Sequence, residues 1–257
     1  MTYRFISALL ILITLSAVSL SDDLSQLTIM TEDYPPFNYQ KNGQLVGFSV
    51  ELLEQAMAYG ARQHNLDIKI LPWPRAYQIL LHNPQSMLFS MTRTRERESQ
   101  FKWVGPISMT RVVLLAKKDN NIKIHSTSEL TQFQIGAIRN DIGDQSLRNI
   151  SDNLRLTYPY SVSALLKMLD NNRIQLLAYE QNVLNWYLDQ DNYDSNEFEP
   201  VFVLEDSELY YAFNKEVSDT LVERFQQAID RVKTELNDQG HSFYYSLAQK
   251  YSVSPSN

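Results

Sequence analysis

The residues best suited to bind a charged small molecule lie in one arginine-rich segment, residues 90–97 (SMTRTRER). An arginine guanidinium donates two parallel hydrogen bonds to a carboxylate, so this segment could hold a small anion. The arginines alternate with Glu96 and Glu98, and such mixed charge runs are typical of solvated loops. We therefore expect Arg93 and Arg97 to be solvated loop residues.

Composition excludes most reactive chemistry. The chain has no cysteine, which rules out disulfides, zinc–thiolate sites, iron–sulfur clusters and cysteine nucleophiles. Its 7 glycines form neither a dinucleotide fingerprint, nor a Walker loop, nor a nucleophile elbow, and its 4 histidines are scattered. We expect no cofactor, no metal and no catalytic residue.

Residues 1–21 differ from the rest of the chain. Arg4 is their one charge, residues 5–15 are almost wholly apolar, and small residues follow at Ala17, Ser19 and Ser21. This layout predicts a signal peptide cleaved near Ser21 and a periplasmic protein. A membrane anchor is the alternative, but its apolar run falls short of the ~20 residues that a span needs.

Cleavage would also remove Arg4 and leave 22 basic residues against 30 acidic ones, a net charge of −8. Such a charge disfavours nucleic acid or an anionic membrane surface as the partner.

Short apolar strands alternate with helices along the remaining chain. Strands are predicted at residues 27–31, 67–71 and 87–91, with helices between them, and the same order repeats from 134 to 188. Further strands are predicted at 112–116, 201–204 and 209–213, and the C-terminal part is predicted to be helical. This alternation favours largely parallel α/β sheets covered on both faces. Two such units in tandem, without a flexible linker, would form a crevice at the carboxyl ends of their strands.

Three segments resemble the family 3 extracellular solute-binding proteins, the amino-acid-binding type that serves ABC importers. Residues 31–39 (TEDYPPFNY) and then 47–52 (GFSVEL) resemble the family's opening motif. Residues 90–97, followed by Phe101, resemble its T-x-x-R signature, and residues 209–215 (LYYAFNK) its return strand. The likeness extends over residues 24–250.

The resemblance implies a two-lobed α/β periplasmic binding protein fold of type II. Each lobe would hold an open, mostly parallel sheet flanked by helices, and two crossover strands would join the lobes. Residues 22–106 and 208–257 would form a large lobe and residues 107–207 a small lobe, closing on a solute by hinge motion.

The resemblance also implies a set of ligand-binding residues. Arg95, with Thr92, would grip the ligand's carboxylate. Ser90 would supply a hydroxyl to the same carboxylate, and Leu88 a backbone carbonyl. Plain strand positions are the alternative for the last two.

The remaining implied residues would line the other walls of the cleft. Tyr34 would cover the ligand, and Trp73 and Arg75 would form a second wall. Arg139 and Ile142 lie at a helix N-terminus that would receive an anion, and Glu180 would bind the amino group. Core packing is the alternative for Tyr34 and Trp73, and a charge at a helix N-terminus is the alternative for Glu180.

One departure from the family pattern concerns the ligand. The large-lobe aspartate that often binds an α-amino group aligns with Thr31, so a simpler carboxylate would also suit the site. We expect a monomeric periplasmic protein that captures a small polar amino acid or related carboxylate for an ABC transporter permease. A membrane sensor is the alternative partner, and a cyclohexadienyl dehydratase-like enzyme is a further alternative.

Overall fold

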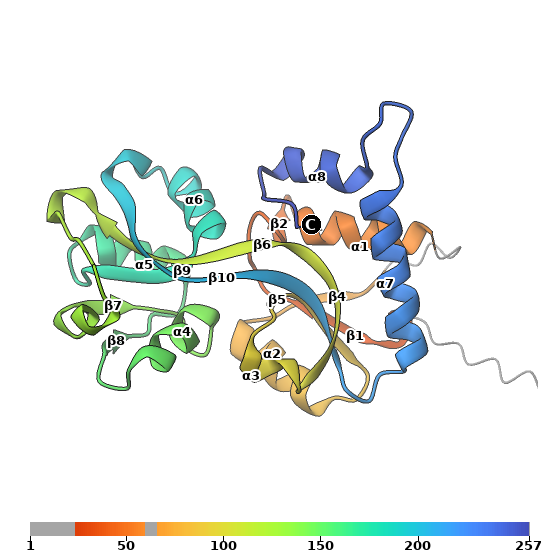
Figure 1. The fold of residues 1–257 in the computed structure, drawn as a ribbon, viewed down its shortest axis with the longest axis horizontal. Coiled ribbons are helices and arrows are strands. Elements are labelled where there is room, and N and C mark those ends of the chain that lie inside the picture. The colour runs from red at the N-terminus through yellow and green to blue at the C-terminus, as the bar shows by residue number, and fades with distance from the viewer. Residues whose placement is uncertain (1–23, 60–65, 257) are drawn as a thin grey trace, which may run out of the picture.

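The computed structural model describes residues 24–59 and 66–256. The predicted signal peptide lies outside these residues. Figure 1 shows two bodies of α/β structure joined by two long strands. We call residues 24–106 and 208–256 the large lobe and residues 107–207 the small lobe, following the division expected above. No helix within the described ranges is long and apolar enough to cross a membrane.

One eight-stranded sheet runs through both lobes in the order β4-β1-β5-β10-β6-β9-β7-β8. The strands are β1 (Thr28–Thr31), β4 (Ile68–Ile70), β5 (Ser86–Thr92), β6 (Phe101–Lys117), β7 (Gln134–Gly136), β8 (Arg155–Thr157), β9 (Leu176–Glu180) and β10 (Phe198–Asn214). β1 pairs in parallel with β4 and β5, and β7 pairs in parallel with β8 and β9. The predicted α/β periplasmic binding protein fold is therefore confirmed.

The connection between the lobes consists of β6 and β10, each 17 residues long and paired antiparallel. The prediction of two separate strands at 201–204 and 209–213 is wrong, because β10 is continuous. Its register shifts between Val203 and Glu205 and again between Leu209 and Tyr211. Each shift interrupts the alternation of inward and outward side chains, so one bent strand has the sequence pattern of two.

Helices cover both faces of the large lobe's part of the sheet. On one face α1 (Phe48–Ala58), α7 (Asp219–Thr234) and α8 (Phe243–Tyr251) share one core cluster. On the other face α2 (Trp73–His82) packs with Leu88 and Met91 of β5. The hairpin of β2 (Tyr39–Lys41) and β3 (Gln44–Val46) turns at Asn42-Gly43, both with positive φ, as the sequence predicts.

Two helices begin at glycine or proline. α1 begins at Phe48 after its N-cap Gly47, and Ser49 lies inside the helix. A Cβ on Gly47 would lie 2.4 Å from the carbonyl oxygen of Phe37, which explains the glycine there. Pro72 is the N-cap of α2 and Pro74 lies in its first turn, where proline is tolerated because the first backbone N–H groups have no helical partner.

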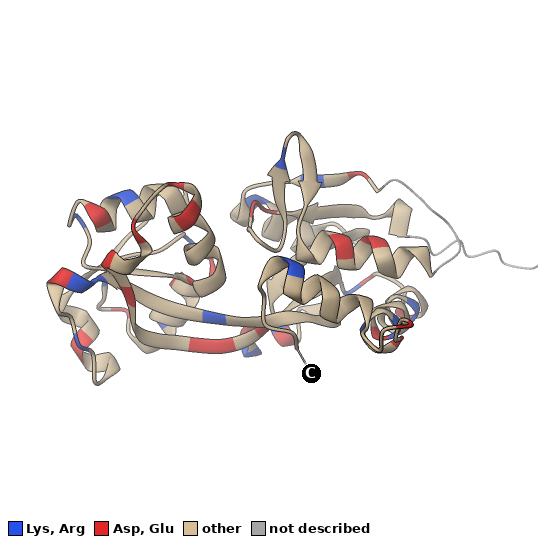
Figure 2. Cartoon of the chain, turned by 90° about the horizontal axis from the view of Figure 1, so that it is seen from above, with Lys and Arg blue, Asp and Glu red and all other residues tan. Residues whose placement is uncertain are grey.

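The small lobe encloses β7 and β9 between helices. α4 (Ile142–Ile150) packs on one face and α5 (Val162–Asp170) with α6 (Gln181–Gln190) on the other. The N-termini of α4 and α6 follow β7 and β9 and face the large lobe. Figure 2 shows that the acidic positions of the two connecting strands lie mainly on one of them. Asp206 of β10 pairs with Arg111 of β6 at 2.6 Å.

Candidate functional site

The candidate site lies where the carboxyl ends of β1 and β5 face the N-termini of α4 and α6. Tyr34 of the large lobe meets Tyr179 of the small lobe edge to face, with ring centroids 5.9 Å apart. Both side chains are 2% exposed, so the two walls of the cleft touch in this arrangement.

Arg97 is the cation of the large-lobe wall. It is 4% exposed, and its guanidinium lies over the rings of Trp73 and Tyr77, 4.9 and 5.4 Å from their centroids. Its Nη1 donates to the carbonyl oxygen of Thr92 at 3.2 Å. Among the described residues no acid lies within ion-pair distance of it. Burial therefore lowers the pKa of Arg97, and the remaining N–H donors are available to an anion.

The expectation that Arg97 is a solvated loop residue is wrong. The segment after β5 contains a short helix, α3 (Arg95–Glu98), whose cap Thr94 accepts a hydrogen bond from the Arg97 backbone N–H. This turn directs Arg97 inward, whereas Arg95 is exposed. Arg93 is half-exposed and pairs with Glu98 at 2.6 Å, in line with the expectation for a solvated residue.

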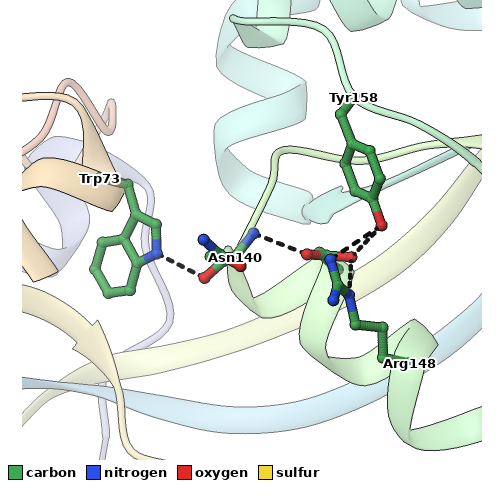
Figure 3. A network of polar contacts seen from close by, with 5 residues as sticks. Trp73, Asn140, Arg148 and Tyr158 are labelled. Carbon is green, nitrogen blue, oxygen red and sulfur yellow. Dashed lines mark hydrogen bonds and ion pairs between the residues drawn. The ribbon is translucent and has the colours of Figure 1, made fainter. Parts of the chain in front are cut away.

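A polar network joins α2 of the large lobe to α4 of the small lobe (Figure 3). The Trp73 indole Nε1 donates to the carbonyl oxygen of Asn140 at 2.7 Å. The Asn140 backbone N–H donates to Asp144 Oδ2 at 2.8 Å, and Asp144 Oδ1 accepts from Arg148 Nε and the Tyr158 hydroxyl. The predicted wall residue Trp73 is thus buried in the large-lobe core and bonded across the cleft.

Further contacts hold the lobes together at both ends of the cleft. On one side Glu96 of α3 accepts from Gln145 and Asn149 of α4, at 3.3 and 3.2 Å. On the other side the Tyr187 hydroxyl donates to Asp33 Oδ2 at 3.4 Å. Tyr39 of β2 packs there against Trp186 of α6, with centroids 5.4 Å apart.

The small-lobe wall presents acids. Glu180 is fully buried and caps α6, where its Oε2 accepts from the Val183 backbone N–H at 2.8 Å and its Oε1 from Asn182 Nδ2 at 3.0 Å. Burial raises the pKa of Glu180 to about 7, and the hydrogen bonds from Val183 and Asn182 oppose that rise. Glu180 is thus a charge at a helix N-terminus, which is the alternative given above. Its expected contact with a ligand's amino group stays a prediction.

Two further acids lie at the cleft, Asp141 in the small lobe and Glu32 in the large lobe. Asp141 is 5% exposed at the start of α4. Burial raises its pKa to about 6, and the Ile142 backbone N–H and the charge of Arg97 oppose that rise. Glu32 follows β1 in the large lobe. Its pKa is raised well above the usual value by burial first and by Asp141 and Asp33 next, whereas Arg97 lowers it. Two acids therefore lie near one arginine.

Other predicted residues of β5 are engaged within the large lobe. Ser90 has φ 61°, and its hydroxyl is hydrogen-bonded to Asn38 Oδ1 and to the Ser49 hydroxyl, the latter at 2.7 Å. The hydroxyl expected to face a carboxylate is thus used inside the lobe. Leu88 is fully buried in the core, and Thr92 is 4% exposed with its carbonyl oxygen on Arg97.

Three predicted residues lie at the margins of the cleft. Arg75 is exposed on α2. Arg139 is also exposed, and its guanidinium stacks on Tyr158 of its own lobe, 4.1 Å from the ring centroid. Ile142 is buried as the first residue of α4.

A groove of about 310 Å³ opens between α2 and α4 onto Arg97. Tyr77, Asn140, Asp144 and Arg148 also line it. Its size lies at the lower end of the ~300–1,000 Å³ typical of small-molecule sites. Within the described ranges no group of three histidine, cysteine or acidic residues could hold a metal ion.

Sequence reasoning missed Arg97 and Glu32 and did not single out Asp141. A usable signal for Arg97 was present: Thr94 and Arg97 repeat the T-x-x-R spacing of Thr92 and Arg95 two residues later. Thr94 is also a good helix N-cap, which would have favoured the second pair. No comparable signal distinguishes Asp141 from its neighbours.

Comparison with known proteins agrees with this architecture. Residues 27–239 match the bacterial extracellular solute-binding proteins, family 3. The "Probable histidine-binding protein" of Campylobacter jejuni is 22% identical over 233 residues, covering 86% of this chain and 82% of that protein. Both descriptions are of binding proteins rather than enzymes.

Two solved structures share the fold at low identity. The arginine-, lysine-, histidine-binding protein ArtJ from Geobacillus stearothermophilus has a TM-score of 0.72 at 18% identity, covering 90% of this chain and 97% of its own. A histidine kinase sensor domain with similarity to periplasmic binding proteins has a TM-score of 0.77 at 16% identity, covering 90% and 98%.

Proposed function

Because this chain belongs to the bacterial extracellular solute-binding proteins of family 3, we propose that it captures a small amino acid between its lobes and delivers it to an ABC importer. The observation that carries the proposal is Arg97, a buried arginine that has no acidic partner among the described residues and opens onto a groove between the lobes. The amino-acid ligands named for the histidine-binding relative and for ArtJ support the same ligand class.

In this proposal Arg97 grips the ligand's carboxylate, in the role that the sequence resemblance gave to Arg95. Trp73 and Tyr77 hold the guanidinium by cation–π contacts, and the Thr92 carbonyl fixes one of its nitrogens. The guanidinium is therefore oriented before the ligand arrives, which lowers the entropy lost on binding.

The ligand's α-ammonium is held by Glu180 from the small lobe. Thr110 of β6 lies beside Glu180 and Tyr34 and is 3% exposed. Its hydroxyl gives the ligand a further polar contact. Because Thr31 stands where the family often has an aspartate, the amino group depends on the small lobe for its charge partner.

Lobe closure completes the site. Tyr34 and Trp73 of the large lobe reach Tyr179 and the Asn140 carbonyl of the small lobe. These contacts exclude water from the carboxylate and ammonium contacts, which strengthens both electrostatically. We further propose that the protein acts as a monomer in the periplasm after cleavage of residues 1–21 near Ser21.

A direct test is to purify the protein without denaturation and identify any bound small molecule by mass spectrometry. A thermal-shift panel of amino acids and dicarboxylates then ranks candidate ligands. We expect at least one L-α-amino acid to raise the Tm in proportion to its concentration and affinity. A protein that responds only to compounds lacking an α-amino group, or to none, contradicts the proposal.

A second candidate is ligand sensing for a membrane signalling protein, favoured by the likeness to the histidine kinase sensor domain. Uptake of the radiolabelled ligand by cells that lack this chain separates the two roles. An import role predicts loss of high-affinity uptake. Retained uptake with a lost transcriptional or chemotactic response would favour sensing.

A further inference from the structure

We propose that Asp141, on the small-lobe wall of the cleft, binds a positively charged group on the ligand's side chain, and that Glu32 of the large lobe adds a second negative charge. The site would then select amino acids that carry a second cationic group. This inference rests on the proposed function, in which Arg97 and Glu180 already hold the carboxylate and the α-ammonium.

Asp141 has the position of a helix cap without acting as one. It is the N-cap residue of α4, where an aspartate side chain ordinarily accepts a backbone N–H of the first turn. Here the side chain makes no cap hydrogen bond, and its Oδ2 is buried without any hydrogen-bond partner among the described residues. Buried carboxylate oxygens are nearly always paired, so this one indicates a partner from outside the protein.

The neighbouring Asp144 provides an internal comparison. It is 1% exposed, and both of its oxygens are used: Oδ2 by the Asn140 backbone N–H, and Oδ1 by Arg148 and Tyr158. Figure 3 shows this network on the small-lobe side of the cleft. Asp144 thus fixes the loop and the helix start, and this leaves Asp141 free for another role.

Asp141 lies at the boundary between the lobes, next to Asn140, whose carbonyl oxygen accepts from Trp73 of the large lobe. Burial raises the pKa of Glu32 and Tyr34 of the large lobe, and the charge of Asp141 raises both further. The carboxylates of Glu32 and Asp141 therefore repel each other across the boundary. A cation placed between them would relieve their mutual repulsion, as a neutral side chain would not.

The charges of the closed cleft favour the same ligand. Two acids, Glu32 and Asp141, lie within electrostatic reach of one arginine, Arg97, and the small lobe adds the buried acid Glu180. The carboxylate and ammonium of an amino acid cancel, so a neutral side chain would leave this excess of negative charge buried. A cationic side chain reduces it, since buried charges are tolerated when they are paired.

Isothermal titration calorimetry with matched ligands tests the inference. Arginine is compared with citrulline, its neutral isostere, and lysine with norleucine. We expect one cationic member to bind at least about tenfold more tightly than its neutral isostere, since hydrogen bonds to charged groups contribute ~1.5–3 kcal/mol. Asp141→Asn should reduce that preference to less than about threefold while leaving citrulline affinity nearly unchanged, as expected when one charge pair is removed. Thermal melts verify that each variant is folded.

Asp144→Asn is the matched control, and it should keep the cationic preference even if it lowers the Tm. Equal or tighter binding of the neutral isosteres would overturn the inference and leave the proposed function standing. So would an Asp141→Asn variant that weakens cationic and neutral ligands equally, since Asp141 would then be only a counterion for Arg97. If no amino acid binds at all, the proposed function fails and the inference with it.

Discussion

The two walls of the cleft hold their charges by different means. In the large lobe the Arg97 guanidinium is fixed by packing between Trp73 and Tyr77 and by one carbonyl oxygen. In the small lobe Glu180 and Asp141 are the N-cap residues of two helices, where backbone N–H groups favour negative charge. Neither wall alone can neutralise a zwitterion, so tight binding requires that both walls meet.

The largest effect should come from removing the large-lobe cation. Arg97→Ala should weaken binding of the native ligand between about 30-fold and several thousand-fold, because an unpaired buried carboxylate costs ~2–5 kcal/mol. Calorimetry measures this effect. Arg95→Ala is the matched control, because Arg95 is exposed two residues away and should change affinity by less than about twofold.

The pair of variants also separates the sequence-based assignment from the structural one. A large loss for Arg95→Ala together with unchanged affinity for Arg97→Ala would restore the original assignment and remove the buried arginine from the site.

The small-lobe wall should give binding its pH dependence. Because burial raises the pKa of Glu180 to about 7, Glu180 takes up a proton as the pH falls through that value and loses its attraction for an ammonium group. Burial also raises the pKa of Asp141 and of Glu32, so both respond in the same direction. We expect affinity to fall by up to about tenfold per pH unit for each proton taken up. Titrations between about pH 8 and pH 6 measure this slope.

Stability of the ligand-free protein should change in the opposite direction. The folded state holds the Glu180 proton more tightly than the unfolded state, so the free energy of unfolding falls as the pH rises from the usual glutamate pKa toward about 7. Urea denaturation across this range measures the fall. Glu180→Gln should flatten both profiles, and an unchanged slope in that variant would assign the titration to another group.

A smaller effect should follow from removing one hydrogen bond between the walls. Trp73→Phe deletes the bond to the Asn140 carbonyl oxygen and should lower ligand affinity about fivefold, as expected for ~1 kcal/mol. Tyr77→Phe is the control, because the Tyr77 hydroxyl bonds Gln100 within the large lobe. Equal losses of affinity for both variants would mean that Trp73 acts through its packing with Tyr77 and Arg97 and not through its hydrogen bond to the small lobe.

The smallest effect should come from the exposed contacts at the cleft edge. Glu96→Ala removes the bonds from Gln145 and Asn149 and should weaken binding by no more than about threefold, because exposed polar pairs contribute ~0.2–1 kcal/mol. Glu98→Ala is its control, since Glu98 pairs with Arg93 inside the large lobe. A loss of affinity above tenfold for Glu96→Ala alone would mean that this edge, rather than the buried walls, contributes most to holding the lobes together.

The sequence predicted the fold well where the signal is local. The Asn42-Gly43 turn, the buried strand that became β5 and the helices after Asp141 and Glu180 all follow from short-range patterns. β10 did not, because its register shifts depend on pairing with β6, which lies about 100 residues earlier in the chain. Local alternation cannot reveal a bend that a distant partner imposes.

The site was predicted less completely, for a related reason. Whether Arg95 or Arg97 turns inward depends on a four-residue helix that begins after Thr94, and a charge pattern alone predicts a loop there. Asp141 differs from Asp144 only in which neighbours reach it after the lobes close. Such differences arise from contacts between segments far apart in the chain.

The path of the chain through the sheet has a consequence for the order of folding. Residues 107–207 of the small lobe are continuous in the chain, whereas the large lobe needs residues 209–213 of β10 beside β5, and these residues are made only after the small lobe. A chain that emerges from its N-terminus can therefore finish its small lobe while β5 still presents an open edge. Because β5 is buried over its whole length in the finished protein, this unpaired edge is prone to aggregation during synthesis.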